Sequence, residues 1–165
     1  MRERGFTIVE LIVAMVIISV LLTLAMIQFN SYTRKSQIES QMRMIYADLA
    51  EVRVKSLFQK RPRAVIISGS QFSFYSSTVT SGIPPVARKT LSYGVRSNDE
   101  GQIDFDANGF LSNIDSGGRG ICLTMGSNPA TVDSLVLSTT RIHLGKWEMP
   151  EGGDDDCTSD NIKQQ

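Results

Sequence analysis

The chain has 165 residues, of which 41% are hydrophobic and 21% are charged. This length and balance fit one globular domain with one appended segment, and they exclude a wholly disordered chain, a collagen-like repeat and a protein with many membrane spans. Lys plus Arg number 17 and Asp plus Glu number 17, so the net charge of zero gives no overall attraction to nucleic acid or anionic lipid.

The first apolar segment is long enough to cross a membrane. Leu11 to Ile27 is a 17-residue run without charge, glycine or proline, and the apolar character extends back to Phe6. At about 1.5 Å per residue, a helix from Phe6 to the flank at Tyr32 exceeds a hydrocarbon core of roughly 30 Å. Ala25-Met26-Ile27 fits a signal-peptide cleavage site poorly, so we expect the anchor to be retained.

Two features distinguish this segment from a plain anchor. A polar leader, Met1 to Gly5, stops abruptly at the apolar run, and Gly5 leaves an unhindered peptide bond for a protease at the membrane surface. Glu10 lies one turn into the apolar run, where an unpaired carboxylate is costly. The sequence therefore indicates a partner for Glu10. The alternative is a simple single-span protein whose Glu10 lies among the lipid headgroups.

The segment Gly5-Phe6-Thr7-Ile8-Val9-Glu10-Leu11 resembles the N-terminal methylation motif of the type IV pilin and pseudopilin superfamily. The resemblance implies that a membrane-embedded prepilin peptidase cleaves between Gly5 and Phe6 and then methylates Phe6. It also implies that Glu10 neutralises the α-amino group at Phe6 of a neighbouring subunit as helices stagger into a filament. Two charges that are each costly in hydrocarbon become tolerable as a hydrogen-bonded pair.

The helix is predicted to continue well beyond the membrane. No Pro or Gly occurs between Phe6 and Arg61, and apolar residues recur at steps of four and three. These residues are Ile38, Met42, Ile45, Leu49 and Val52. The polar side chains fall largely off this stripe: Gln37, Glu39, Arg43, Asp48, Glu51, Arg53 and Lys55. We expect a helix from about Phe6 to Phe58, ended by Pro62. The family often has proline where this chain has Ile27, so the helix is expected to be unbroken there.

After Pro62 the hydrophobic period changes from 3.6 to 2, and turn residues separate short β-type runs. Strands are predicted at residues 64–68, 71–76, 90–95, 102–105, 109–114, 120–124, 134–138 and 141–147. Asn108-Gly109 is a strong hairpin turn signal. The predicted fold class is α+β: a long N-terminal α-helix, comprising membrane span and amphipathic stalk, packed on a C-terminal antiparallel β-sheet head, as in pilins.

This pattern divides the chain into four parts. They are a leader peptide at 1–5, a transmembrane or filament-core helix at 6–33, an amphipathic helix at 34–61 and a β-rich head with an acidic C-terminal tail at 62–165. Within the superfamily the order of elements resembles GspH/FimT-type minor pseudopilins and minor pilins. The segments that carry this resemblance are Asp48–Arg53, Ile103–Gly109 and Leu137–Ile142.

The sequence has no recognisable catalytic constellation, so no enzyme activity, cofactor or metal site is expected. Alternation in Arg141-Ile142-His143-Leu144 indicates an exposed surface position for His143, the only histidine. Gly117 to Gly120 fits no phosphate-binding pattern and is interpreted as a flexible turn. Asp154 to Asp156 lacks the spacing of a calcium loop and is interpreted as a solvated acidic tail, with calcium binding as the alternative.

Cys122 and Cys157 are the only cysteines, and they lack zinc-ligand spacing. The resemblance places both outside the cytoplasmic membrane, where oxidising machinery operates, and therefore favours a disulfide between them over two free thiols. Such a bond would attach the C-terminal tail to the predicted strand at 120–124.

Residues 34–63 contain eight basic and three acidic side chains. Lipid headgroups and the dipole at the end of a helix both account for such a cluster. Some FimT-type minor pilins bind DNA through a Gly-Arg-x-Arg-like pattern. Here Thr140-Arg141-Ile142-His143 replaces that pattern, so Arg141, His143 and Lys146 are weak candidates for phosphate contacts.

The function implied is that of a minor pilin or pseudopilin, processed by prepilin peptidase, which primes or caps assembly of a type IV pilus or a type II secretion pseudopilus. Its expected partners are other pilin-type subunits and the bacterial inner membrane, with the head in the periplasm. Two alternatives remain open: a competence-type minor pilin that captures DNA, and a single-span periplasmic β domain that never assembles.

Overall fold

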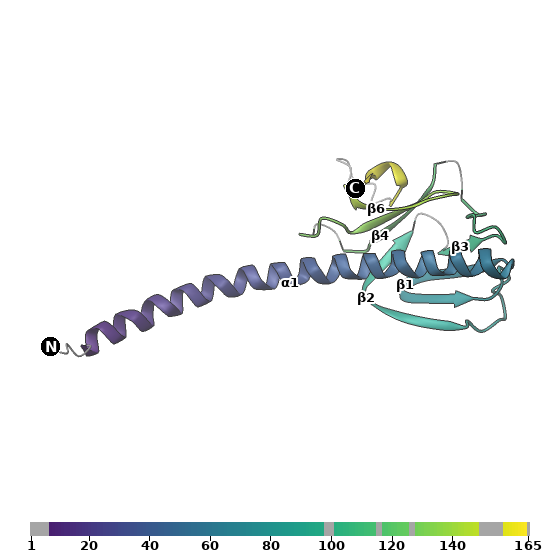
Figure 1. Ribbon diagram of the computed structural model, residues 1–165. Helices are drawn as coiled ribbons and strands as arrows, with labels where there is room; N and C mark the ends of the chain where they lie inside the picture. Colours follow the sequence, from purple (N-terminus) through teal and green to yellow (C-terminus); the bar gives the residue numbers. More distant parts are fainter. Residues whose placement is uncertain (1–6, 98–100, 115–116, 126–127, 149–156, 165) are drawn as a thin grey trace.

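The computed structural model describes residues 7–97, 101–114, 117–125, 128–148 and 157–164. Its most prominent element is one long helix, α1 (Ile8–Gln59), whose first half projects away from a β-rich head (Figure 1). The helix curves gently and runs unbroken through position 27, as predicted from the lack of proline. At about 1.5 Å per residue it is nearly 80 Å long.

Both ends of α1 are set by local chemistry. Thr7 is the N-cap and forms a capping box with Glu10. At the other end Lys60 adopts a left-handed conformation with φ of 52°, and its N–H donates to the Ser56 carbonyl. Pro62 follows and cannot continue the helix. The helix ends one residue beyond the predicted Phe58, and the predicted start at Phe6 lies outside the described residues.

The second half of α1 packs on the sheet through the predicted stripe. All five stripe residues are at most 6% exposed, and they share one core with side chains from the strands. The largest of those strand side chains are Phe72, Ile103, Phe105, Ile121, Leu123, Leu135 and Leu137. Asp48, which lies beside the stripe, is also buried. Its carboxylate is held against the sheet by Lys89, whose Nζ lies 2.6 Å from Oδ1.

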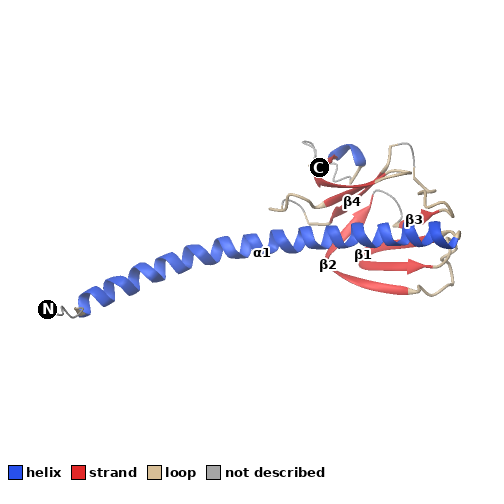
Figure 2. Ribbon diagram, viewed as in Figure 1, coloured by secondary structure: helices blue, strands red, loops and turns tan. Residues whose placement is uncertain are grey.

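Seven antiparallel strands form one sheet in the described part of the chain (Figure 2). The order across the sheet is β3-β1-β2-β4-β5-β6-β7. The strands are β1 (Arg63–Tyr75), β2 (Ala87–Ser97), β3 (Gln102–Phe105), β4 (Arg119–Leu123), β5 (Ser134–Leu137), β6 (Ile142–Trp147) and β7 (Ile162–Gln164), with a 3₁₀ turn, η1 (Ser159–Asn161), before β7. The α+β class with an antiparallel head is therefore confirmed.

Three strand predictions need correction. The runs at 64–68 and 71–76 form the single strand β1, whose register shifts between Gly69 and Gln71. The run at 109–114 is not a strand, and only Leu111 makes a bridge, to Phe105. A side chain takes the place of a partner strand there, because Asp106 Oδ1 accepts hydrogen bonds from the backbone N–H groups of Asn108 and Phe110, each at 2.8 Å. Strand β7 was missed because its three residues include two polar ones.

Arg119 is buried, although its segment was interpreted as a flexible turn. It lies in β4, and its guanidinium donates to the carbonyls of Gln102 and Asn113. The contact with Gln102 connects β4 with β3, although β1 and β2 lie between these two strands in the sheet. Within this segment the turn is confined to Gly117 and Gly118, and the φ of 80° at Gly118 suits glycine.

A smaller apolar cluster contains the disulfide. Cys122 on β4 is bonded to Cys157, and both pack with Val136, Trp147 and Ile162. Gly120 makes room for this arrangement, because a Cβ there would lie 2.3 Å from the Cys157 carbonyl oxygen. The bond therefore attaches the C-terminal segment to the middle of the sheet, and the pairing of β7 with β6 adds to it.

We expect the double variant Cys122→Ser, Cys157→Ser to lose about 4 kcal/mol of stability, because the bond closes a loop of 35 residues in the unfolded chain. Urea unfolding of the detergent-purified protein, followed by the fluorescence of Trp147, measures this loss. Wild-type protein under reducing conditions is the matched control. A loss below about 1 kcal/mol would show that strand pairing alone holds the tail.

Candidate assembly interface

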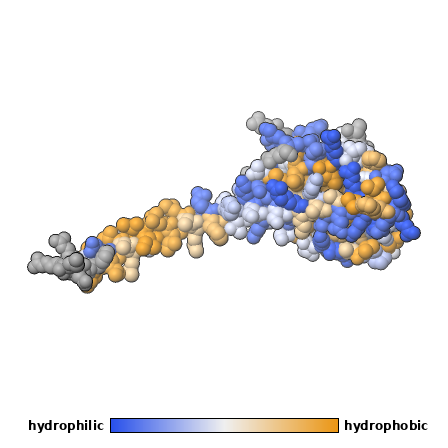
Figure 3. All heavy atoms as spheres, in the orientation of Figure 1, coloured by the Kyte–Doolittle hydropathy of each residue, from blue (hydrophilic) through white to orange (hydrophobic). Residues whose placement is uncertain are grey.

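The first half of α1 presents apolar side chains on all sides. Its large apolar residues from Ile8 to Tyr32 are 51–80% exposed, and Figure 3 shows them as a continuous hydrophobic rod. Among the described residues, α1 is the one helix that is long enough and apolar enough to cross a membrane. A helix that is hydrophobic all round requires an apolar environment, either lipid or other helices.

Three hydroxyl groups in and next to this rod are satisfied within the helix. The hydroxyls of Ser19, Thr23 and Thr33 donate to the backbone carbonyls four residues earlier, at 2.7–2.9 Å. No polar hydrogen of these side chains is left for water to bind, which suits burial in hydrocarbon or in a helix bundle.

Glu10 lies at the N-terminal end of the rod. Its Oε2 accepts hydrogen bonds from the backbone N–H and the hydroxyl of Thr7, each at 3.2 Å, while the Glu10 N–H donates to the Thr7 hydroxyl. The carboxylate thus faces the unpaired N–H groups and the positive end of the helix dipole. Gly5 and Phe6, the predicted cleavage and methylation positions, lie outside the described residues and stay predictions.

The three weak candidates for DNA contacts do not form one patch. His143 and Lys146 are three residues apart in β6, so their side chains point to opposite faces of the sheet. Lys146 is already engaged, since its Nζ lies 2.5 Å from Asp133 Oδ2. His143 is half-buried, not exposed as predicted, whereas Arg141 is exposed. The geometry therefore provides no continuous basic surface from these three residues.

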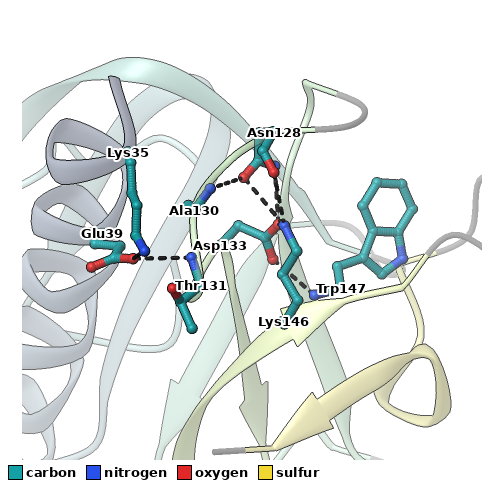
Figure 4. A network of polar contacts seen from close by, with 8 residues as sticks. All are labelled: Lys35, Glu39, Asn128, Ala130, Thr131, Asp133, Lys146 and Trp147. Carbon is teal, nitrogen blue, oxygen red and sulfur yellow. Dashed lines mark hydrogen bonds and ion pairs between the residues drawn. The ribbon is translucent and has the colours of Figure 1, made fainter. Parts of the chain in front are cut away.

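Lys146 belongs to a polar network that no local sequence pattern indicates (Figure 4). Asp133 is only 1% exposed, and its carboxylate also accepts from the Trp147 backbone N–H at 2.8 Å and from Asn128 Nδ2 at 2.9 Å. On the helix side, Glu39 accepts from the Thr131 backbone N–H at 2.9 Å. Together these contacts hold the 128–133 loop between α1 and β6.

A second group of charges surrounds a cleft of about 180 Å³ between α1 and the β1–β2 strands. Besides the Asp48–Lys89 pair, Glu51 lies 2.5 Å from Lys55 across one helical turn, and that ammonium lowers the pKa of the Glu51 carboxyl. Lys89 also lies over the Phe74 ring, 5.8 Å from its centroid. Only the Asp48–Lys89 pair connects helix and sheet, and neither pair provides the nucleophile and base of a catalytic site.

No group of three metal-ligating side chains comes together within the described residues. The acidic run Asp154 to Asp156 lies outside them.

Comparisons with known proteins agree with this geometry. Residues 1–26 match the family model described as the prokaryotic N-terminal methylation motif. Crystal structures of the type IV minor pilin FimU from Pseudomonas aeruginosa have a similar fold. The P21 form gives a TM-score of 0.55 at 18% identity, over 76% of this chain and 98% of that one. The P65 form gives 0.53 at 19% identity, over 72% and 98%. No curated protein sequence matches the chain.

The motif and the fold are independent observations, since one concerns the first 26 residues and the other concerns mainly the arrangement of helix and sheet. Together they give the chain a prokaryotic N-terminal methylation motif and a fold similar to that of a type IV minor pilin.

Proposed function

We propose that the chain is a minor pilin or pseudopilin that is processed by a prepilin peptidase and primes or caps assembly of a type IV pilus or a type II secretion pseudopilus. The observation that carries this proposal is the methylation motif at residues 1–26, which opens a helix that runs without a break into a head of minor-pilin fold. Such a chain acts by assembling with other subunits through its helix.

The proposed location is the bacterial inner membrane, with the head in the periplasm. The exposed apolar half of α1 supports insertion, because its length matches a hydrocarbon core. The Cys122–Cys157 disulfide supports a head outside the cytoplasm, since such bonds persist in oxidising compartments. After assembly the same apolar residues would exchange lipid for neighbouring helices.

Glu10 is proposed to align neighbouring subunits. In the single chain its carboxylate is occupied by Thr7 through contacts of 3.2 Å, at the long end of the hydrogen-bond range. Cleavage after Gly5 would create a charged α-amino group at Phe6. Pairing of Glu10 with that amino group on a neighbour would replace the weaker contacts with a charge-assisted one, which is strongest where water is excluded.

We expect the membrane-extracted protein to begin at N-methylated Phe6 when prepilin peptidase is co-expressed, and to keep Met1 when it is not. Intact mass and N-terminal sequencing distinguish the two states. A start at Met1 in the presence of active peptidase, or a start near Ala25, would contradict the proposed function.

We expect Glu10→Ala to be cleaved and methylated normally but to enter filaments on the order of tenfold less than wild type, because a buried amino group of a neighbour would lose its counter-charge. Immunoblots of sheared filaments against total membrane protein measure the ratio. Glu148→Ala is the matched control, since Glu148 is an exposed acid on the head. Equal incorporation of wild type and Glu10→Ala would contradict the proposal that Glu10 aligns neighbouring subunits.

A further inference from the structure

A second apolar surface lies on α1 beside the head. It consists of Tyr46, Ala47, Val54, Leu57 and Phe58, which we call the outer face. All five side chains are exposed, and Phe58 is the most exposed at 78%. At 3.6 residues per turn, Ala47, Val54 and Phe58 lie opposite the buried stripe that packs on the sheet, and Tyr46 and Leu57 lie at one edge of the outer face, nearer to the head. The head therefore leaves this face uncovered.

The membrane does not reach the outer face if α1 stands upright in it. Residues 33–43 interrupt the apolar surface with a polar collar, in which Arg34, Lys35 and Arg43 carry positive charge. Val54 lies roughly 33 Å along the helix from Tyr32, at 1.5 Å per residue. An apolar surface this far from the membrane is available to a protein partner that lies alongside the helix.

The charge around the outer face is positive. Arg43, Lys60 and Arg61 are exposed, and within the described residues their side chains make no hydrogen bond or ion pair. The neighbouring acid, Glu51, is neutralised by Lys55. A second copy approaching through the same face would bring these cations together, whereas a partner with acidic residues would pair with them.

Building on the proposed function, we infer that the outer face docks a different pilin-type subunit whose contacting surface is apolar with acidic residues around it. A neighbour anchored in the same membrane would lie parallel to α1 and could follow it from the apolar rod to the head. The small side chain of Ala47 permits close approach of a helix, and Phe58 offers a large anchor at the far end.

The test uses the full-length chain co-expressed with prepilin peptidase and the other pilin-type subunits of its system. A photo-crosslinking amino acid replaces Phe58, and mass spectrometry of the crosslinked peptides identifies the contact. We expect crosslinks to an acidic segment of a different pilin-type subunit. Crosslinks to a second copy of this chain, to lipid alone or to no protein would overturn the inference.

Substitutions provide the quantitative arm. Val54→Asp and Phe58→Asp should each lower co-purification with the crosslinked subunit on the order of tenfold, because a charge is placed in the apolar contact. Val79→Asp, which changes an exposed apolar residue outside the outer face, is the matched control and should have little effect. Formation of the disulfide reports that each variant folds. Unchanged co-purification of both outer-face variants would refute the docking site.

The charge assignment is tested separately. Arg43→Glu combined with Lys60→Glu should weaken the same co-purification and make it less sensitive to salt. Stronger binding after the charge reversal would contradict the inference that the partner's contacting surface is acidic. Every variant is also checked for methylated Phe6 by mass. Failure of the wild type to be processed would count against the proposed function itself, whereas normal processing with unchanged binding counts against the outer face only.

Discussion

The packing of one helical stripe against one sheet determines how the rest of this molecule is organised. The stripe from Ile38 to Val52 and the large strand side chains are excluded from water together, and this contact fixes the direction in which the helix leaves the head. Because hydrophobic burial has no intrinsic direction, charged pairs such as Asp48 with Lys89 connect particular positions of helix and sheet. The projecting half of α1 is thereby held in one orientation.

A single helix serves two environments without a break. Its first half is apolar on every side and satisfies the hydroxyls of Ser19 and Thr23 internally, whereas its second half is amphipathic and buries one stripe in the head. In proteins most of the stability of a helix comes from the packing of its apolar surface. The exposed half therefore depends on lipid or on neighbouring helices, which is the physical basis for proposing that the chain functions by assembly.

The head is reinforced by contacts that each join distant segments of the chain. The disulfide attaches the C-terminal segment to β4, Arg119 connects β4 with the start of β3, and Asp133 holds the loop before β5 to β6. Buried charges of this kind are costly unless every partner is in place. The buried carboxylate of Asp133 therefore holds Lys146, which the sequence suggested as a phosphate contact, in an ion pair within the head.

The amino-acid sequence alone determined the long helix, its inward stripe, the antiparallel head and the methylation motif, because periodicity, breakers and a contiguous motif are local properties. The tertiary structure decided the burial of Asp48 and Arg119, the merging of two runs into β1, the loss of the strand at 109–114 and the separation of His143 from Lys146. These outcomes depend on partners far away in the chain. The pattern of residues within a segment indicates which secondary structure that segment can form. Which side chains are buried, paired or left exposed is decided only when segments that are distant in the chain pack together.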